Sequence, residues 1–202
     1  MKNILVNPKV SINKIRKEVN DVIDQALIKW LMQNSYNPII ISNKIIIGSK
    51  KKNFDFFKKI KIQGIVLSGG NDGSTKNPRY DSQMLLIDYA LKKRIPVLGI
   101  CQGMQMIGVK YGSKLKKVKN HVRKKHKLIN LSKSKFPTTV NSYHNYSLNG
   151  CPKNFIITTK SPDGSIESIK HKFYNWEGWM WHPERDKTID KINNYRLKKI
   201  FK

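Results

Sequence analysis

Apolar residues along the chain fall into two patterns, short continuous runs and longer stretches with helical spacing. The continuous runs, typical of strands buried on both faces, lie at 4–6, 39–41, 64–67 and 95–98. The stretches with apolar residues three or four apart, which predict helices, lie at 13–33, 53–59, 80–93 and from 102 to Gly112. Strands that alternate with helices over short loops predict an α/β fold with a parallel sheet flanked by helices.

From Lys114 onward the pattern changes to strands. They are expected at 127–131, 155–159, 165–169 and 178–181, followed by a last helix at 187–201. No repeat or linker divides the 202 residues, so we expect a single domain over residues 1–202. The chain starts without the apolar run of a signal peptide, and no stretch approaches the ~20 apolar residues that span a bilayer. We therefore expect a cytoplasmic protein.

Charge is the unusual property of the composition. Lys and Arg number 40 against 13 acidic residues, which gives a formal net charge of +27. Such an excess suggests a nucleic-acid-binding domain, but only six of these residues are Arg, the preferred base-reading side chain. We therefore expect neither nucleic acid nor a membrane as partner. The basic run from Lys114 to Lys127 is open to three interpretations: a solvated loop, a wall of a site for an anionic substrate, or a nucleic-acid surface.

The sequence concentrates candidate chemistry at Cys101. The apolar run 95–98 leads into Gly99-Ile100-Cys101-Gln102-Gly103, a Gly-x-Cys-x-Gly turn between a strand and a helix. Such a turn presents a nucleophile at the edge of a sheet, and the N-terminus of the following helix favours a thiolate and an oxyanion. A buried structural cysteine beside an ordinary turn is the alternative that this segment alone leaves open.

A histidine and a carboxylate near the end of the chain offer that cysteine a base. His182, Pro183 and Glu184 are expected in an extended segment, where residues two apart point to the same face. Glu184 would then orient the imidazole of His182, as in the activated nucleophiles of covalent catalysis. A solvent-exposed turn is the alternative for these three residues alone, and the presence of Cys101 weakens it.

A glycine-rich turn, Ser68-Gly69-Gly70-Asn71-Asp72, follows the strand at 64–67. Consecutive glycines let backbone N–H groups converge on an anion, although the same residues also make ordinary turns. This turn and the cysteine turn both follow strands, and ligands bind at the carboxyl ends of strands in parallel sheets. A glycine N–H could therefore donate to an oxyanion beside the amide of Gln102.

These three segments, in this order, resemble the class I (triad) glutamine amidotransferase family, and within it the stand-alone, peptidase C26-like γ-glutamyl hydrolases. The cysteine turn is similar to the family's Gly-x-Cys-x-Gly-x-Gln, and residues 181–184 are similar to its His-x-Glu segment. The Gly-Gly turn looks like the hydrolase type, and a helix around 16–21 resembles that branch too. Two positions depart from the family: Met180, where Gln is usual, and Gln102, where Leu, Arg or Tyr is more frequent.

The resemblance implies a flavodoxin-like parallel sheet with a strand-rich C-terminal half, and a cysteine-dependent amide hydrolase that needs no cofactor. The triad that it implies is Cys101, His182 and Glu184. The oxyanion and substrate-binding residues that it implies are Gly69, Gly70, Gln102, Gln105, Ser142, Tyr143 and His144. Within this set, Gln105 and the 142–144 loop would hold the α-amino and α-carboxylate groups of a γ-glutamyl unit.

The leaving group is a separate question. The resemblance, together with small size and basic charge, favours the hydrolases that split γ-glutamyl-CDP-amidate into glutamate and cytidine diphosphoramidate during capsule polysaccharide modification. Two alternatives stay open: a γ-glutamyl-GABA-type hydrolase, and a glutaminase subunit that supplies ammonia to a separate synthase. The hydrolase-type Gly-Gly turn favours free-standing hydrolysis of an anionic γ-glutamyl substrate over a synthase partner.

The other histidines and the second cysteine carry no predicted chemistry. His121, His126 and His171 show no metal-ligand spacing with other His or Cys residues, so we expect no metal site. Cys151, which precedes Pro152, is expected to be inert. Two cysteines, one of them needed as a free thiolate, are typical of a reducing compartment.

Overall fold

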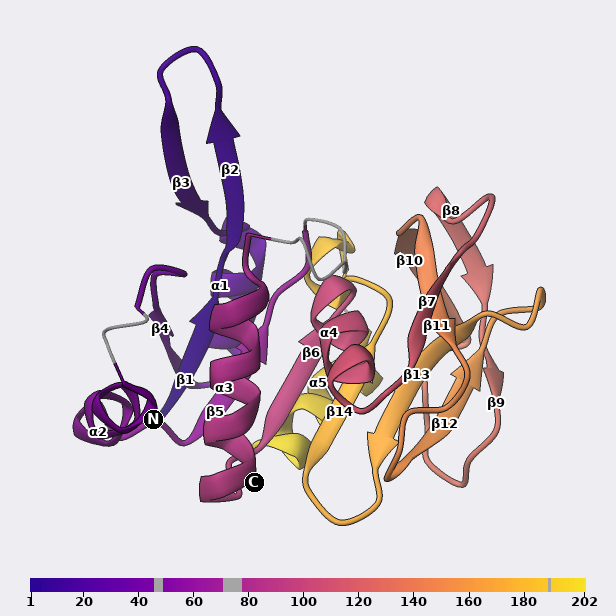
Figure 1. Ribbon diagram of the computed structural model, residues 1–202. Helices are drawn as coiled ribbons and strands as arrows, with labels where there is room; N and C mark the ends of the chain where they lie inside the picture. The colour runs from indigo at the N-terminus through magenta and orange to yellow at the C-terminus, as the bar shows by residue number, and fades with distance from the viewer. Residues whose placement is uncertain (46–48, 71–77, 189) are drawn as a thin grey trace.

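The computed structural model describes residues 1–45, 49–70, 78–188 and 190–202. A sheet of eight strands in this described part runs in the order β4-β1-β5-β6-β14-β13-β12-β9 (Figure 1). In that order the strands are β4 (Tyr36–Ile40), β1 (Lys2–Asn7), β5 (Gly64–Leu67), β6 (Val97–Ile100), β14 (Trp176–Trp179), β13 (Ile166–His171), β12 (Phe155–Lys160) and β9 (Ile129–Asn130). The first five are parallel, and β13, β12 and β9 continue the sheet antiparallel.

Helices cover both faces of this sheet. The helices are α1 (Gln25–Gln33), α2 (Lys50–Lys59), α3 (Tyr80–Lys93), α4 (Gln102–Lys110) and α5 (Lys191–Ile200). Side chains of α2, α3 and α4 share one core with Leu5 of β1, whereas α1 and α5 share the other with Ile4 and Val6. Successive residues of a strand point to opposite faces, so β1 contributes to both cores. The predicted α/β fold with a strand-rich C-terminal half is confirmed.

The central strands β5 and β6 correspond to two of the continuous apolar runs of the sequence. Every residue of β5 and β6 is buried, as expected where helices cover both faces of a parallel sheet. The predictions of a strand at 64–67 and a helix at 80–93 match β5 and α3 to the residue. No helix in the described part of the chain is long and apolar enough to cross a membrane.

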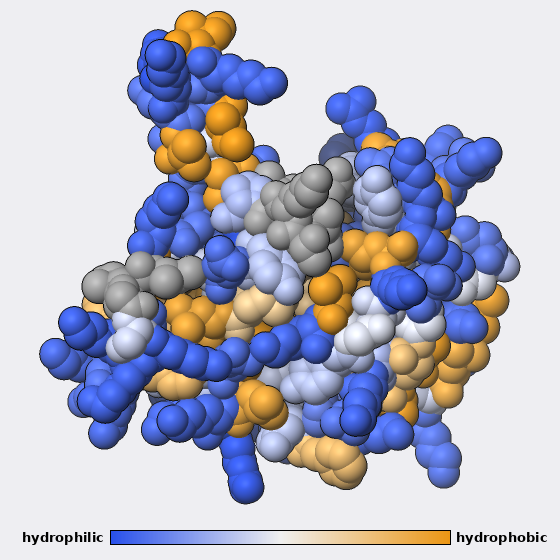
Figure 2. Space-filling model, in the orientation of Figure 1, coloured by the Kyte–Doolittle hydropathy of each residue, from blue (hydrophilic) through white to orange (hydrophobic). Residues whose placement is uncertain are grey.

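The predicted helix over 13–33 is wrong in its first half. A hairpin of β2 (Lys9–Asn13) and β3 (Glu18–Val22) projects from the body, and α1 begins only at Gln25 (Figure 1). The Asn13 side chain accepts hydrogen bonds from the N–H groups of Ile15 and Arg16, which closes the turn. The β-branched residues that imitated a helical stripe instead lie exposed along the hairpin, where they favour strands (Figure 2). The expected helix around 16–21 is absent for the same reason.

The basic run 114–127 forms strands, so its interpretation as a solvated loop is wrong. β7 (Lys114–Lys117) pairs with β11 (Tyr146–Asn149), and β8 (Val122–Lys127) pairs with β10 (Thr139–Tyr143), each antiparallel. The lysine side chains of both strands are exposed, so no apolar alternation marks these strands in the sequence. Lysines on such short exposed strands also discourage pairing with another molecule.

Three neighbouring parallel strands end at one edge of the main sheet. Ser68 follows β5, Cys101 follows β6, and His182 lies shortly beyond β14. Because β5, β6 and β14 are adjacent in the sheet, this edge brings together the three segments that the sequence singled out. Ligands bind at the carboxyl ends of strands in such sheets, so the topology places the candidate site there.

Candidate active site

Cys101 occupies a strained turn between β6 and α4. Its backbone has φ 50° and ψ −106°, and α4 starts at the next residue, Gln102. A non-glycine residue in such a conformation costs about 1–3 kcal/mol and persists only where its surroundings hold it. The Cys101 N–H supports the turn by donating to the carbonyl oxygen of Trp179 at 2.7 Å. The predicted nucleophile turn is present in the backbone.

Two glycines allow close approaches around this turn. A Cβ on Gly103 would run into the carbonyl oxygen of Leu67, so glycine lets α4 pack against the end of β5. A Cβ on Gly69 would run into the imidazole of His182 and would lie 3.4 Å from Cβ of Cys101. The turn after β5 therefore lies directly against both candidate catalytic side chains.

His182 and Glu184 form a buried pair. The distance from His182 Nδ1 to Glu184 Oε1 is 2.7 Å. Asn141 holds the main chain of His182 from both sides, accepting from its N–H at 2.9 Å and donating to its carbonyl oxygen at 2.7 Å. Residues Pro183–Arg185 form a 3₁₀ turn, so the extended segment that we predicted is wrong, yet the turn brings the carboxylate to the ring.

The pKa of His182 reflects these neighbours. Burial alone would lower that pKa, but the charge of Glu184 and a hydrogen bond with Cys101 outweigh burial and raise the pKa to about 9. A protonated imidazole beside the thiol is the state that can donate a proton to a leaving group. The arrangement therefore combines a thiol, a proton donor and an orienting carboxylate.

The sequence is similar to those of known proteins over most of its length. A family described as glutamine amidotransferase class-I matches residues 17–199. The chain belongs to the class I glutamine amidotransferase family. One curated relative, the γ-glutamyl-CDP-amidate hydrolase of Campylobacter jejuni, is 34% identical over 172 residues, which cover 81% of this chain and 78% of that protein.

Two further comparisons support the family and the fold. A glutamine-hydrolysing GMP synthase subunit of Methanococcus vannielii is 30% identical over 165 residues, covering 78% of this chain and 82% of that one. A solved glutamine amidotransferase structure from Thermotoga maritima is similar with a TM-score of 0.66 and 19% identity, covering 98% of this chain and 83% of that chain. At that identity the second similarity concerns the fold alone.

Arg79 is a site residue of this amidotransferase fold that the sequence analysis missed. Its side chain is fully buried and donates to the carbonyl oxygens of Asn7, Ser68, Gly69 and Gly70 at 3.0, 3.1, 3.2 and 3.3 Å. Burial lowers the pKa of Arg79 to about 9, against the opposing effects of Cys101 and Asp21. Arg79 thus fixes the Gly69–Gly70 turn by hydrogen bonds to its carbonyl groups. Asn71 and Asp72, the rest of the predicted turn, lie outside the described residues.

The two departures from the family pattern have structural partners. The side-chain amides of Gln102 and Gln83 exchange two hydrogen bonds, at 2.9 and 3.0 Å, which join α4 to α3. Gln105 donates to the carbonyl oxygen of Tyr146 at 2.9 Å and lies 3.9 Å from the sulfur of Met180. The side chain of Gln102 is therefore engaged with α3 in the core, and Gln105 connects α4 with the start of β11.

The three residues of the predicted substrate loop do not point to the same side, because neighbouring side chains in an extended segment alternate in direction. The Ser142 hydroxyl donates to the carbonyl oxygen of His121 at 2.6 Å, and His144 is buried next to the same histidine. Tyr143 points the other way, is 40% exposed, and has its ring centroid 5.9 Å from that of His182. Of these three side chains, the structure places Tyr143 beside His182 and turns the other two inward.

A basic groove adjoins this site. A narrow recess of about 20 Å³ includes Ser68, Gly69, His182 and Glu184 in its wall, and Arg185 lines both this recess and a groove of about 620 Å³. The guanidinium of Arg185 lies 5.0 Å from the ring centroid of Tyr143. Other basic residues lining the groove are Arg123, Lys124, Lys125 and Lys187. Part of the basic run on β8 therefore borders the approach to His182.

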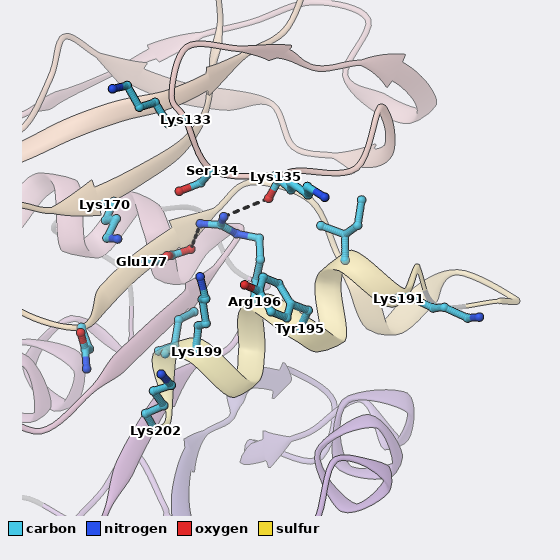
Figure 3. A pocket seen from close by; sticks show the side chains of 13 residues that line it. Lys133, Ser134, Lys135, Lys170, Glu177, Lys191, Tyr195, Arg196, Lys199 and Lys202 are labelled. Atoms are coloured by element: carbon cyan, nitrogen blue, oxygen red, sulfur yellow. Dashed lines mark hydrogen bonds and ion pairs between the residues drawn. The ribbon is translucent and has the colours of Figure 1, made fainter.

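Another basic cavity, of about 770 Å³, lies at the amino-terminal end of β14, away from the catalytic edge (Figure 3). Lysines from α5 and from the 133–135 segment surround it, and Arg196 forms an ion pair with Glu177 at its wall, with Nη2 and Oε2 2.5 Å apart. No cysteine or histidine is among the described residues that line it. This cavity therefore lacks the thiol and the imidazole that lie together at Cys101 and His182.

Replacing Arg79 tests its part in holding the Gly69–Gly70 turn. We expect Arg79→Met to lower the free energy of unfolding by about 3 kcal/mol or more, because two buried and two partly buried carbonyl groups lose a charged donor. Urea unfolding measures this loss. The exposed Arg94 offers a matched control, since Arg94→Met should change that free energy by no more than about 0.5 kcal/mol. An unchanged urea midpoint for Arg79→Met would contradict the role of the guanidinium.

Proposed function

We propose that this amidotransferase-family protein hydrolyses a γ-glutamyl amide bond with Cys101 as nucleophile, His182 as acid and base, and Glu184 as the orienting carboxylate. One observation carries the proposal: Cys101 stands in a strained turn at the start of α4, with the buried His182–Glu184 pair against the same glycine turn. This is the geometry of a nucleophile next to a base that a third group orients. Relatives that include a γ-glutamyl-CDP-amidate hydrolase support the reaction class.

The residues divide the reaction between them as follows. The Cys101 thiolate attacks the γ-carbonyl carbon, and the oxygen becomes an anion that accepts hydrogen bonds from the N–H of Gln102 and from an N–H of the Gly69–Gly70 turn. His182 protonates the departing nitrogen, which leaves the glutamyl group on sulfur as a thioester. Water then loses a proton to His182, attacks the thioester and releases glutamate.

The basic groove supports an anionic leaving group. Arg123, Lys124 and Lys125 on β8, with Arg185 and Lys187, outnumber the two carboxylates among the described residues of the groove, Asp186 and Asp190, and Arg185 also lines the recess at His182. Such a surface attracts phosphate oxygens and raises the local concentration of an anionic substrate. We therefore propose γ-L-glutamyl-CDP-amidate as the substrate and cytidine diphosphoramidate as the product beside glutamate, which would place the enzyme in capsule polysaccharide modification.

The second candidate is a glutaminase subunit that passes ammonia to a synthase. Similarity to a glutamine-hydrolysing subunit of GMP synthase favours it. A protein of that kind would hydrolyse glutamine slowly until the synthase binds, and it would need no basic groove for its leaving group. A γ-glutamyl-GABA-type hydrolase would instead release 4-aminobutyrate, which carries one carboxylate and no phosphate, so charge reversal in the groove would have a much smaller effect.

A substrate screen with groove variants separates these candidates. We expect the γ-glutamyl nucleotide amidate to give a higher kcat/KM than glutamine or γ-glutamyl-GABA, and this advantage to shrink as ionic strength rises, because salt screens exposed charges beyond about 8 Å at physiological concentration. Released glutamate is the readout. Lys124→Glu should raise KM for the nucleotide substrate about tenfold, and Lys116→Glu, outside the groove lining, should leave it unchanged. Equal turnover of glutamine and every anionic substrate would favour the ammonia-supplying subunit instead.

A further inference from the structure

A buried group of imidazoles and carboxylates lies behind the 142–144 segment, apart from the catalytic residues. His121 Nδ1, His126 Nε2 and His144 Nε2 lie 3.6, 3.2 and 3.5 Å from one oxygen of Glu167. Glu167 is fully buried, and neither of its carboxylate oxygens has a hydrogen-bond partner among the described residues. His126 Nε2 is likewise buried without one. Buried polar atoms rarely lack a hydrogen-bond partner, so we expect an ion or a proton to be bound among these side chains.

The outer contacts of two histidines fix where their protons lie. His121 Nε2 is 2.8 Å from a carboxylate oxygen of Asp163, and His144 Nδ1 is 3.1 Å from the carbonyl oxygen of Tyr146. In the neutral rings each of these nitrogens carries the proton, because its partner can only accept. His121 Nδ1 and His144 Nε2, 3.2 Å apart, then both direct lone pairs toward each other and toward Glu167. A cation between them, either a metal ion or a shared proton, makes this arrangement favourable.

Carboxylate and carbonyl contacts of this kind are the ones that orient metal-binding histidines. Donors bound to Zn²⁺ at about 2.0–2.1 Å in a tetrahedron lie roughly 3.3 Å from one another. The four donor separations around Glu167 and His121 are 3.2, 3.2, 3.5 and 3.6 Å. Ligand atoms of His121, His126 and Glu167 all lie within 4.8 Å of one another. We propose that His121, His126 and Glu167 bind a divalent transition-metal ion of the Zn²⁺ type, with His144 Nε2 beside them at 3.2 Å from His121 Nδ1.

The proposed site is structural. Glu167 is fully buried and the two histidine ligands are almost so, which places the ion inside the protein rather than against a substrate. The donors come from β8, β13 and the residue before β8, so one ion would tie the two-stranded β8–β10 sheet to the main sheet. Tyr143, the neighbour of His144, borders the catalytic residues, so the ion would stabilise that wall of the site. Spacing in the sequence missed it because Glu167 lies far along the chain from His121 and His126.

Metal titration of the full-length protein tests this site. Cys101→Ala serves as the parent protein, because a thiolate beside His182 could itself bind zinc. After treatment with a chelator, we expect the parent to take up one Zn²⁺ per chain with a rise in melting temperature, and Co²⁺ to give the visible absorption bands of a four-coordinate ion. His126 is the most exposed donor, with 14% of its side chain accessible, so adding His126→Asn should keep the fold and weaken uptake about 100-fold or more.

Two further variants complete the experiment. Glu167→Gln in the same parent should also lose the ion, whereas Cys151→Ser, which removes an exposed thiol that is not among the ligands, should retain it. The proposal is overturned if the parent takes up no stoichiometric metal, which would leave a shared proton as the occupant of the cluster. It is equally overturned if uptake and the rise in melting temperature survive both His126→Asn and Glu167→Gln.

Discussion

Cys101→Ala is expected to abolish the release of glutamate from γ-glutamyl substrates, with kcat falling about 10⁴-fold or more. The remaining donors can still polarise the carbonyl group, but no atom is left to form the thioester. The fold should persist, because alanine keeps the Cβ of this buried residue and the N–H that donates a hydrogen bond to Trp179 in the strained turn belongs to the backbone. Steady-state glutamate release, with circular dichroism of the same sample, makes the measurement.

Cys151→Ser is the matched control for this prediction. Its thiol is exposed and makes one weak contact, to the carbonyl oxygen of Phe155 at 3.3 Å, so turnover should stay within about twofold of the unchanged protein. Substantial activity in Cys101→Ala would show that hydrolysis does not pass through a thioester on this residue. Loss of activity in both variants would show that the Cys151 thiol is also needed, which the proposed mechanism does not explain.

His182→Asn is expected to be about as damaging as the loss of Cys101, and Glu184→Gln is expected to be milder. Without the imidazole neither the departing nitrogen nor the attacking water has a proton partner. Glutamine at 184 still accepts a hydrogen bond from the ring but no longer stabilises its positive charge. Values of kcat for the three proteins on one γ-glutamyl substrate test the order, and equal rates for His182→Asn and the unchanged protein would exclude His182 as acid and base.

The pH dependence of activity tests the same roles, because Glu184→Gln should move the alkaline decline in a definite direction. The carboxylate of Glu184 helps to raise the pKa of His182 to about 9, so the protonated ring is available below that pH and activity should decline as pH rises through it. Glu184→Gln removes the charge that favours the protonated ring, so the pKa falls and the alkaline decline moves to lower pH. A decline that stays in place, or moves to higher pH, would contradict the orienting role.

The central sheet and the three candidate catalytic residues could be predicted because each depends on a local pattern. Continuous apolar runs predict β5 and β6. The Gly-Gly turn follows β5 and Cys101 follows β6. The parallel pairing of β5, β6 and β14 then brings the turn, Cys101 and His182 together, as the order of segments suggested. Local pattern and topology agree at this edge of the sheet.

The remaining features depend on contacts between distant segments. Arg79 reaches residue 7 and the 68–70 turn, and no spacing in the sequence connects these positions. Asn141 holds His182 across 41 residues. The hairpin at 9–22 was predicted as a helix because its apolar residues recur at three and four positions, and an Asn13 turn overrides that spacing. Strands β7 and β8 escaped prediction because their exposed faces are filled by lysine.

The basic residues of the groove that stand on β8 have a consequence for changing the substrate that the protein accepts. The side chains at 123–125 stand on β8, a strand outside the main sheet, whereas Cys101 and the Gly69–Gly70 turn lie at the ends of buried strands. Surface positions of this kind tolerate replacement with little loss of stability. A library randomised at these three positions should therefore yield folded enzymes that differ in leaving-group preference, which makes β8 the natural starting point for directed evolution.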